Sequence, residues 1–210
     1  MNISRLYAES SIGKIRSLHD FSRLAEKNRR EAYEIFTSPM FGNLLKKEEG
    51  KEASRKQMLY AGLTRPPVTM QSMEEFLIAG KLKSRVELQM MEREAKLENV
   101  TETVKEGFQI SRNGWGYLEI RVTSQGDFLR PLREKLGTDD FVGSTVNIEY
   151  YVDQEKLHSG KNLGQIEVCT PYQRLVYEVC VHQHSAKKRE ESDVELRRMQ
   201  AVFMLSLIHI

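Results

Sequence analysis

The sequence predicts an α+β fold, in which an N-terminal helical subdomain is followed by an antiparallel β-sandwich and a C-terminal helix. Up to about residue 84, apolar side chains recur at the spacing of amphipathic helices. The period then changes to two, as Val86, Leu88 and Met90 alternate with polar residues. Helical spacing returns at Ser185. The predicted domains are a helical subdomain at 1–84, a sandwich at 85–184 and the start of a helical region at 185–204.

The helical part contains four predicted helices. Their starts lie at or near Asp20, Ser38, Ala53 and Ser72. Asp20 is the predicted N-cap of the first helix, which runs through Phe36. Pro39 suits the first position of the second helix. Ser72 has the capping-box spacing to Glu75, so it is expected to open the fourth helix.

The second part reads as a series of short strands. They are expected near residues 85–92, 102–111, 115–124, 145–152, 163–169 and 173–182, with a short edge strand within 126–131. Short strands at such spacing are typical of an antiparallel β-sandwich.

A hairpin is predicted at Arg112-Asn113-Gly114, because Asn-Gly between two strand-like runs is a common hairpin turn. A three-residue loop places the apolar residues of both strands on one face, whereas a two-residue loop separates them. We therefore predict the three-residue loop, with Gly114 in a left-handed bulge position. The shared apolar face then consists of Phe108, Ile110, Leu118, Ile120 and Val122.

The same loop turns Trp115 and Tyr117 away from the sandwich core, and exposed aromatic area usually has a use. These two residues are the candidate interface or packing face. In the first interpretation they pack against the N-terminal helices, and Trp115 anchors the helical part to the sandwich. In the second they stack on a sugar or a protein partner.

The two cysteines are predicted to be free thiols. With a turn at residues 170–173, Cys169 pairs with Arg174 and Cys180 lies opposite Leu163. That offset is on the order of 20 Å at about 3.3 Å per residue. A disulfide needs Cα atoms within roughly 7 Å. Free cysteines fit a reducing compartment.

Other reactive groups give weak patterns. Cys180, His182 and His184 share one face of a strand and are zinc-ligand types, but the spacing matches no metal signature and a fourth ligand is missing. Asp139-Asp140 is interpreted as the polar end of a turn. The sequence has no Gly-x-Ser-x-Gly motif and no phosphate loop. We predict no catalytic residue, no cofactor and no bound metal.

Charge and hydropathy indicate which classes of partner are not expected. Lys and Arg total 32 against 30 Asp and Glu, so bulk charge demands no acidic partner. Basic residues are not clustered with aromatics, so nucleic-acid binding is not expected. No apolar run approaches the roughly 18 residues of a membrane span. The N-terminus lacks a signal-peptide pattern, which predicts a cytoplasmic protein.

The last six residues, Leu205-Ser206-Leu207-Ile208-His209-Ile210, are similar to the translation of a sequencing-library transposon adapter. We therefore interpret residues 205–210 as a non-native tail.

Several stretches carry a family resemblance. They are Ser11-Ile12-Gly13-Lys14-Ile15, Glu75-Phe76-Leu77, Arg112-Asn113-Gly114-Trp115-Gly116-Tyr117, Gly126-Asp127-Phe128, Thr138-Asp139-Asp140-Phe141-Val142-Gly143 and Leu157-His158-Ser159-Gly160-Lys161-Asn162-Leu163-Gly164. They resemble an uncharacterised family of large, clostridial-type bacterial multidomain proteins that contain a domain of unknown function. The resemblance implies immunoglobulin-like sandwiches followed by helical repeats, with this chain as an internal fragment. It brings no activity, cofactor or catalytic residue.

The expected function is that of a non-catalytic structural or interaction module in a larger bacterial scaffold protein. Its expected partners are neighbouring domains of the same chain and a protein partner. The alternative is a carbohydrate-binding β-sandwich that serves a hydrolase whose catalytic domain is absent from this fragment.

Overall fold

A computed structural model describes residues 8–46, 50–184 and 197–199. The chain divides into two compact units, which are described separately. The helical unit comprises Met1–Gln89, Ser111–Glu119 and Gly137–Thr145, and the sandwich unit comprises Met90–Ile110, Ile120–Leu136 and Val146–Ile210. The sequence predicts that residues 85–89, 111–119 and 137–145 belong to the sandwich, but these three segments group with the helices.

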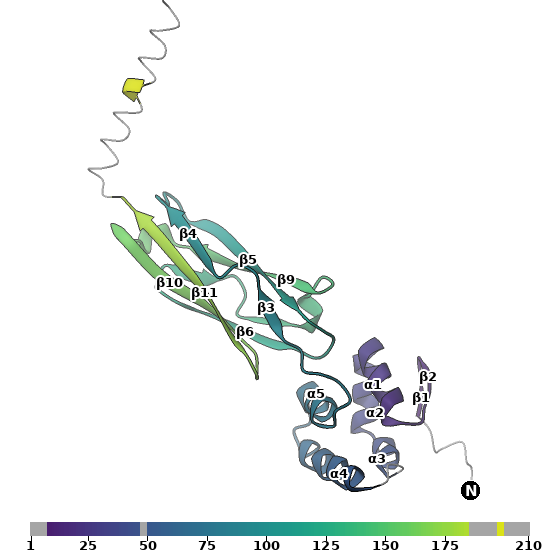
Figure 1. The fold of residues 1–210 in the computed structure, drawn as a ribbon. Coiled ribbons are helices and arrows are strands. Elements are labelled where there is room, and N and C mark those ends of the chain that lie inside the picture. The colour runs from purple at the N-terminus through teal and green to yellow at the C-terminus, as the bar shows by residue number, and fades with distance from the viewer. Residues whose placement is uncertain (1–7, 47–49, 185–196, 200–210) are drawn as a thin grey trace, which may run out of the picture. The chain divides into compact units, whose positions relative to one another are not determined.

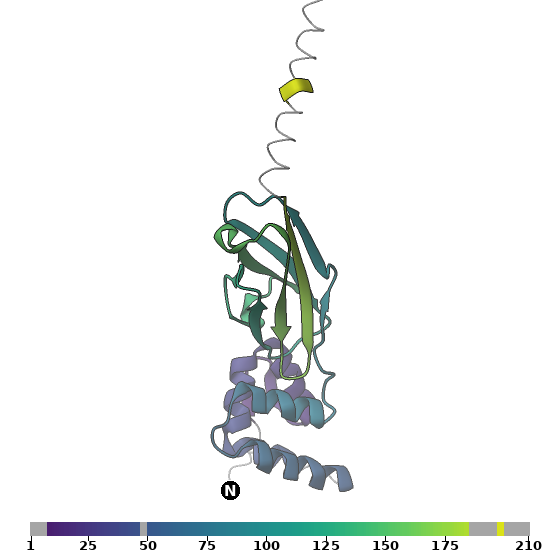
Figure 2. The same cartoon turned by 90° about the vertical axis from the view of Figure 1, so that its left-hand side faces the viewer.

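The helical unit starts with a two-stranded hairpin and continues with five described helices (Figure 1). The elements are β1 (Ala8–Ser10), β2 (Gly13–Ile15), α1 (Leu18–Lys27), α2 (Arg29–Thr37), α3 (Pro39–Leu45), α4 (Lys51–Leu63) and α5 (Met70–Ala79). Within this unit, α4 and α5 lie side by side in both ribbon views (Figures 1 and 2).

Side-chain caps decide where the first two helices begin and end. Ser17, not Asp20, is the N-cap of α1, and Asp20 completes a reciprocal capping box with it. Asn28 then accepts a hydrogen bond from the Glu31 N–H and starts α2. The predicted single helix through Phe36 is therefore two helices, because an internal Asn satisfies the N–H groups of a new helix start.

Of the predicted starts of α3 and α5, the first is confirmed and the second is wrong. Pro39 begins α3 after Ser38, as predicted. By contrast, Thr69 caps α5, and Ser72 is the third helical residue of its capping box. The predicted start at Ser72 is late because the Thr69 and Ser72 hydroxyls each accept a backbone N–H from the other residue.

An aromatic cluster forms the core of the helical unit. Phe21, Phe36, Phe41 and Phe76 are fully buried. The ring centroids of Phe21 and Phe41 are 4.7 Å apart, and those of Phe41 and Phe76 are 5.2 Å apart. Each buried Phe contributes roughly 1.5–3 kcal/mol from apolar burial. The helical spacing thus identifies the side chains that hold this unit together.

The sandwich is built from short strands in two sheets. They are β3 (Leu88–Met90), β4 (Glu94–Glu98), β5 (Val104–Arg112), β6 (Glu119–Gln125), β7 (Leu129–Pro131), β8 (Lys135–Gly137), β9 (Thr145–Val152), β10 (Gly160–Cys169) and β11 (Arg174–Gln183). Short 3-10 helices lie at Thr138–Asp140 and Gln154–Lys156.

The strand order is that of an immunoglobulin-like sandwich. One sheet has the order β3-β5-β9-β7, and the other contains β11-β10-β6 with β4 and β8 at its edges. Phe108 of β5 stacks on Tyr177 of β11 at 4.0 Å between centroids, which joins the two inner faces. The α+β class is therefore as predicted, although β4 pairs parallel, not antiparallel, with β11.

The predicted hairpin at Arg112-Asn113-Gly114 is wrong. β5 ends at Arg112 and β6 begins at Glu119, but the two strands lie in different sheets. In this loop it is Gly116, with φ 152°, and not Gly114, that has a positive φ. The burial argument failed because a chain that crosses between two facing sheets also buries the apolar residues of both strands.

The register of β10 and β11 is confirmed. Cys169 pairs with Arg174, and Leu163 pairs with Cys180. Both cysteines are free thiols. The prediction succeeded because one short turn joins the two strands, so its position fixes every cross-strand pair.

The C-terminal predictions fall largely outside the described residues. Arg197, Arg198 and Met199 are helical. The rest of the predicted region 185–204 and the predicted tail 205–210 lie beyond what the structure describes.

Candidate functional site

A buried ion pair lies in the helical unit. Glu74 belongs to α5, Lys83 follows that helix, and the side chain of each is 3% exposed. The Lys83 ammonium donates hydrogen bonds to Glu74 Oε1 and to the Trp115 carbonyl oxygen, the latter at 2.6 Å. Glu74 Oε2 accepts the Tyr117 N–H at 3.0 Å. The pair therefore fixes the backbone on both sides of Gly116.

The Trp115 ring completes this cluster. Lys83 Nζ lies 4.4 Å from the ring centroid, in cation–π contact. Trp115 is half-buried and packs against the aromatic core that includes Phe36 and Phe76. Burial lowers the pKa of Lys83, while the hydrogen bond and charge of Glu74 act in the opposite direction. We call Glu74, Lys83, Trp115, Gly116 and Tyr117 the anchor cluster.

Gly116 is required by this geometry. A Cβ at this position would overlap Lys83 Nζ and come within 2.5 Å of Glu74 Oε1. Its φ of 152° also favours glycine. The neighbouring Tyr117 is half-buried, and burial raises the pKa of its phenol. The anchor cluster thus requires glycine at position 116 as well as the charged side chains of Glu74 and Lys83.

The sequence predicted Trp115 and Tyr117 as candidates but missed Glu74 and Lys83. Glu74 gave a usable signal, because it sits on the apolar face of its helix, three residues before Leu77. A carboxylate at such a position requires a buried partner. Nothing in the sequence near Lys83 identifies that partner.

Two of the three predicted turn residues, Arg112 and Asn113, form hydrogen bonds within the helical unit. The Arg112 guanidinium donates to the Gly143 carbonyl oxygen at 3.0 Å. Asn113 Oδ1 accepts the Glu87 N–H at 2.8 Å. Gly114 has open space around its Cα. Asp140 accepts the Gly137 N–H at 2.6 Å, so this carboxylate holds a turn, as expected for Asp139-Asp140.

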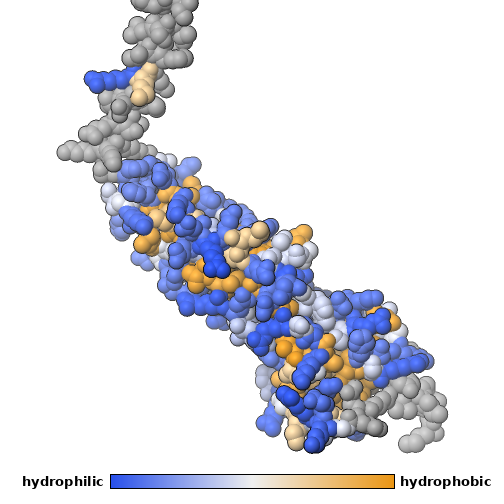
Figure 3. All heavy atoms as spheres, in the orientation of Figure 1, coloured by the Kyte–Doolittle hydropathy of each residue, from blue (hydrophilic) through white to orange (hydrophobic). Residues whose placement is uncertain are grey.

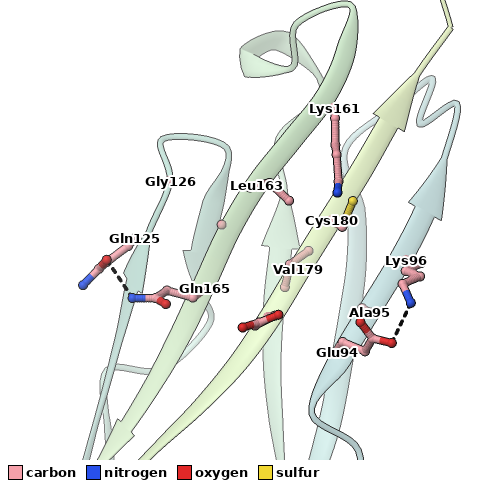
Figure 4. Close-up of a pocket in the computed structure, with 12 residues that line it drawn as sticks. Glu94, Ala95, Lys96, Gln125, Gly126, Lys161, Leu163, Gln165, Val179 and Cys180 are labelled. Atoms are coloured by element: carbon pink, nitrogen blue, oxygen red, sulfur yellow. Dashed lines mark hydrogen bonds and ion pairs between the residues drawn. The ribbon is translucent and has the colours of Figure 1, made fainter.

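A second candidate is a groove of about 410 Å³ on the outer face of the β4-β11-β10-β6 sheet (Figure 4). Figure 3 shows hydrophobic residues interrupting the hydrophilic surface in the region of this sheet. Leu163 is 66% exposed there, and the Lys161 side chain points toward Cys180 (Figure 4). Glu94 and Lys96 form an ion pair at 2.6 Å along the β4 side. The lining residues include no aromatic ring, so the groove offers no platform for stacking a sugar.

Residues 1–208 match a family described as "Family of unknown function (DUF5717) N-terminal". The chain belongs to this family. Among curated proteins no relative was found.

Solved structures similar to this DUF5717 chain include three examples. A PapD-like domain of human CEP192 is 8% identical with a TM-score of 0.36, covering 48% of this chain and 86% of that one. The titin M3 domain is 8% identical with a TM-score of 0.29, covering 47% and 97%. A family 123 glycoside hydrolase from Clostridium perfringens is 6% identical with a TM-score of 0.36, covering 46% and 27%.

On the strand face that carries Cys180, His182 and His184 in this DUF5717 chain, the two imidazole rings stack on each other. The His182 and His184 centroids are 5.0 Å apart, and His184 Nδ1 lies 2.8 Å from Asn99 Oδ1. In the described part of the chain, no group of three or more His, Cys, Asp or Glu residues is placed to hold a metal ion. Among the described helices, none is long and apolar enough to cross a membrane.

Proposed function

We propose that this chain is a non-catalytic structural and interaction module of a larger bacterial scaffold protein. The anchor cluster carries the proposal. Its buried lysine and carboxylate are directed at the chain's own backbone and at the Trp115 ring. Such an arrangement stabilises a loop and leaves neither charge facing a substrate.

The proposed partners are neighbouring domains of the same protein and a protein partner. The outer-face groove supports a protein partner, because it combines an exposed Leu163 with both signs of charge. The proposed location is the cytoplasm, which the two free thiols support.

The carbohydrate-binding alternative needs a free aromatic ring. Trp115 is the natural candidate, but Lys83 lies against its ring and the ring packs on the helical core. These contacts favour the structural role.

Fluorescence tests the proposal, because Trp115 is the single tryptophan. We expect a blue-shifted emission that acrylamide quenches poorly and that oligosaccharides leave unchanged. Lys83→Met should shift the emission, whereas the matched variant Lys161→Met, in the groove, should not. A red-shifted, readily quenched emission that responds to an oligosaccharide would overturn the structural role in favour of sugar binding.

A further inference from the structure

Among the described strands, β4 has a hydrogen-bonded neighbour on one side only. It is the outermost strand of its sheet and runs parallel to β11. Two backbone hydrogen bonds define which residues face β11. The Glu178 N–H donates to the Arg93 carbonyl oxygen at 2.8 Å, and the Asn99 N–H donates to the His182 carbonyl oxygen at 2.9 Å.

Every second residue of a strand bonds to a given neighbour, and the residues between them point their N–H and C=O groups the other way. Arg93 and Asn99 face β11, so Glu94, Lys96 and Glu98 present their backbone groups to the free side. No described strand lies beyond β4 on that side. The side chains of Glu94 and Lys96 are 56% and 69% exposed. This is an unpaired edge, the kind of surface that pairs with another strand.

The charged side chains along this edge are complementary to those of the same strand in a second copy of the chain. We propose that β4 pairs antiparallel with β4 of a second copy of this chain, about a two-fold axis at Ala95. Glu94 of each copy then lies opposite Lys96 of the other, and each such pair exchanges both of its N–H···O bonds. The two Ala95 residues meet at a non-hydrogen-bonded position, where Cα atoms come within about 4.5 Å and a small side chain fits. Figure 4 shows Glu94 and Lys96 on the same face of β4.

Alternative registers are less favourable. Centring the pair on Lys96 would place Lys96 against Lys96 and Glu94 against Glu98, which are like charges directly opposite each other. Centring it on Leu97 would also place Lys96 opposite Glu98, but it would place Ala95 opposite Asn99. Asn99 has φ 50° and ends the strand, so that register loses pairing. The Ala95-centred register places each Glu94 opposite a Lys96, and its like-charge pairs, Glu98 against Glu92, lie at the ends of the contact, where Glu92 is outside β4.

The edge lysine otherwise protects against non-specific pairing. In the proposed register the same residue becomes attractive, so one sequence repels most strands and accepts its own copy. Because the contact is small, the dimer is expected to be weak and concentration-dependent. The inference does not depend on the proposed function, since it concerns only the sandwich unit's edge.

Sedimentation equilibrium of the 210-residue chain, up to about 1 mM, tests the proposal. Wild type should dimerise. Glu94→Lys and Lys96→Glu should each weaken the dimer by on the order of tenfold or more, because each replaces opposite charges by like ones. Mixing these two variants, or combining both changes in one chain, should restore it.

Lys161→Glu is the matched control for net charge, because Lys161 lies on the same sheet but away from β4, and it should dimerise like wild type. Glu98→Lys should not weaken the dimer, because Glu98 lies opposite Glu92 in this register, whereas in the Leu97-centred register it would lie opposite Lys96 and the dimer would weaken. Thermal melts verify that each variant folds. A wild type that stays monomeric, or variants whose association ignores the charge swaps, would overturn the proposal.

Discussion

Replacing Glu74 by Gln removes the negative charge of the anchor cluster while keeping the side chain's shape. The Lys83 ammonium would then be 3% exposed with no counter-charge. Breaking a buried ion pair by removing one partner costs roughly 3–5 kcal/mol. For a chain of this size that corresponds to a fall in Tm of about 6–20 °C. Lys83→Met should cost a similar amount, because it leaves the Glu74 carboxylate buried.

The double variant Glu74→Gln/Lys83→Met should cost far less than the sum of the single changes. It removes both charges, and the Gln oxygen still accepts the Tyr117 N–H. We expect a loss of about 1–2 kcal/mol, mostly from the missing Lys83 hydrogen bond to the Trp115 carbonyl oxygen. The assay is urea unfolding followed by Trp115 fluorescence, which reports directly on this cluster.

The exposed pair Lys105–Glu149 provides a matched control in the sandwich. Its side chains are 46% and 36% exposed at 2.8 Å separation. Glu149→Gln should therefore change stability by less than about 1 kcal/mol. Single Glu74 and Lys83 variants that cost no more than this control, or a double variant that costs the full sum, would refute the reasoning.

Three further results are expected. Gly116→Ala should lose about 3 kcal/mol or more in urea unfolding, through strained φ and overlap with Lys83, while Gly114→Ala should stay near wild type; equal effects would contradict the loop geometry. Thiol titration of unfolded, unreduced protein should count both cysteines, and a count of zero at monomer mass would contradict the strand register. The Arg174 hydrogen bond holds the pKa of Glu167 below its usual 4.5, so the stability that this ion pair contributes is present above pH 4.5 and is lost as pH falls through the folded-state pKa. The Tm difference between wild type and Arg174→Gln should therefore vanish in strong acid. A Tm difference that persists in strong acid would show that it does not come from the Glu167 carboxylate.

Side chains close in sequence were the predictable ones. The apolar spacing predicted helices over the segments that contain Phe21, Phe36, Phe41 and Phe76, and the buried face of each helix follows from that periodicity. The β10–β11 register followed from one short turn. Both are local patterns, whose consequences extend over a single element or a single connection.

The anchor cluster and the crossing between sheets were not predictable in this way. Glu74 and the Tyr117 N–H that it binds are 43 residues apart, and no local pattern joins them. The loop after Arg112 has the same alternation whether it returns within one sheet or crosses to the other, because both arrangements bury the same side chains. Strand β4 was missed because its exposed charges suppress the apolar signal of an edge strand.

The parallel pairing of β4 with β11 also has a mechanical consequence. The two strands run in the same direction from the Glu94–Glu178 pair to the Glu98–His182 pair. The entry to β4 and the exit from β11 therefore lie at opposite ends of the ladder. Tension applied to the chain before β4 and after β11 pulls the strands past each other and loads their hydrogen bonds together. A hairpin such as β10–β11, pulled at its open end, would separate one bond at a time.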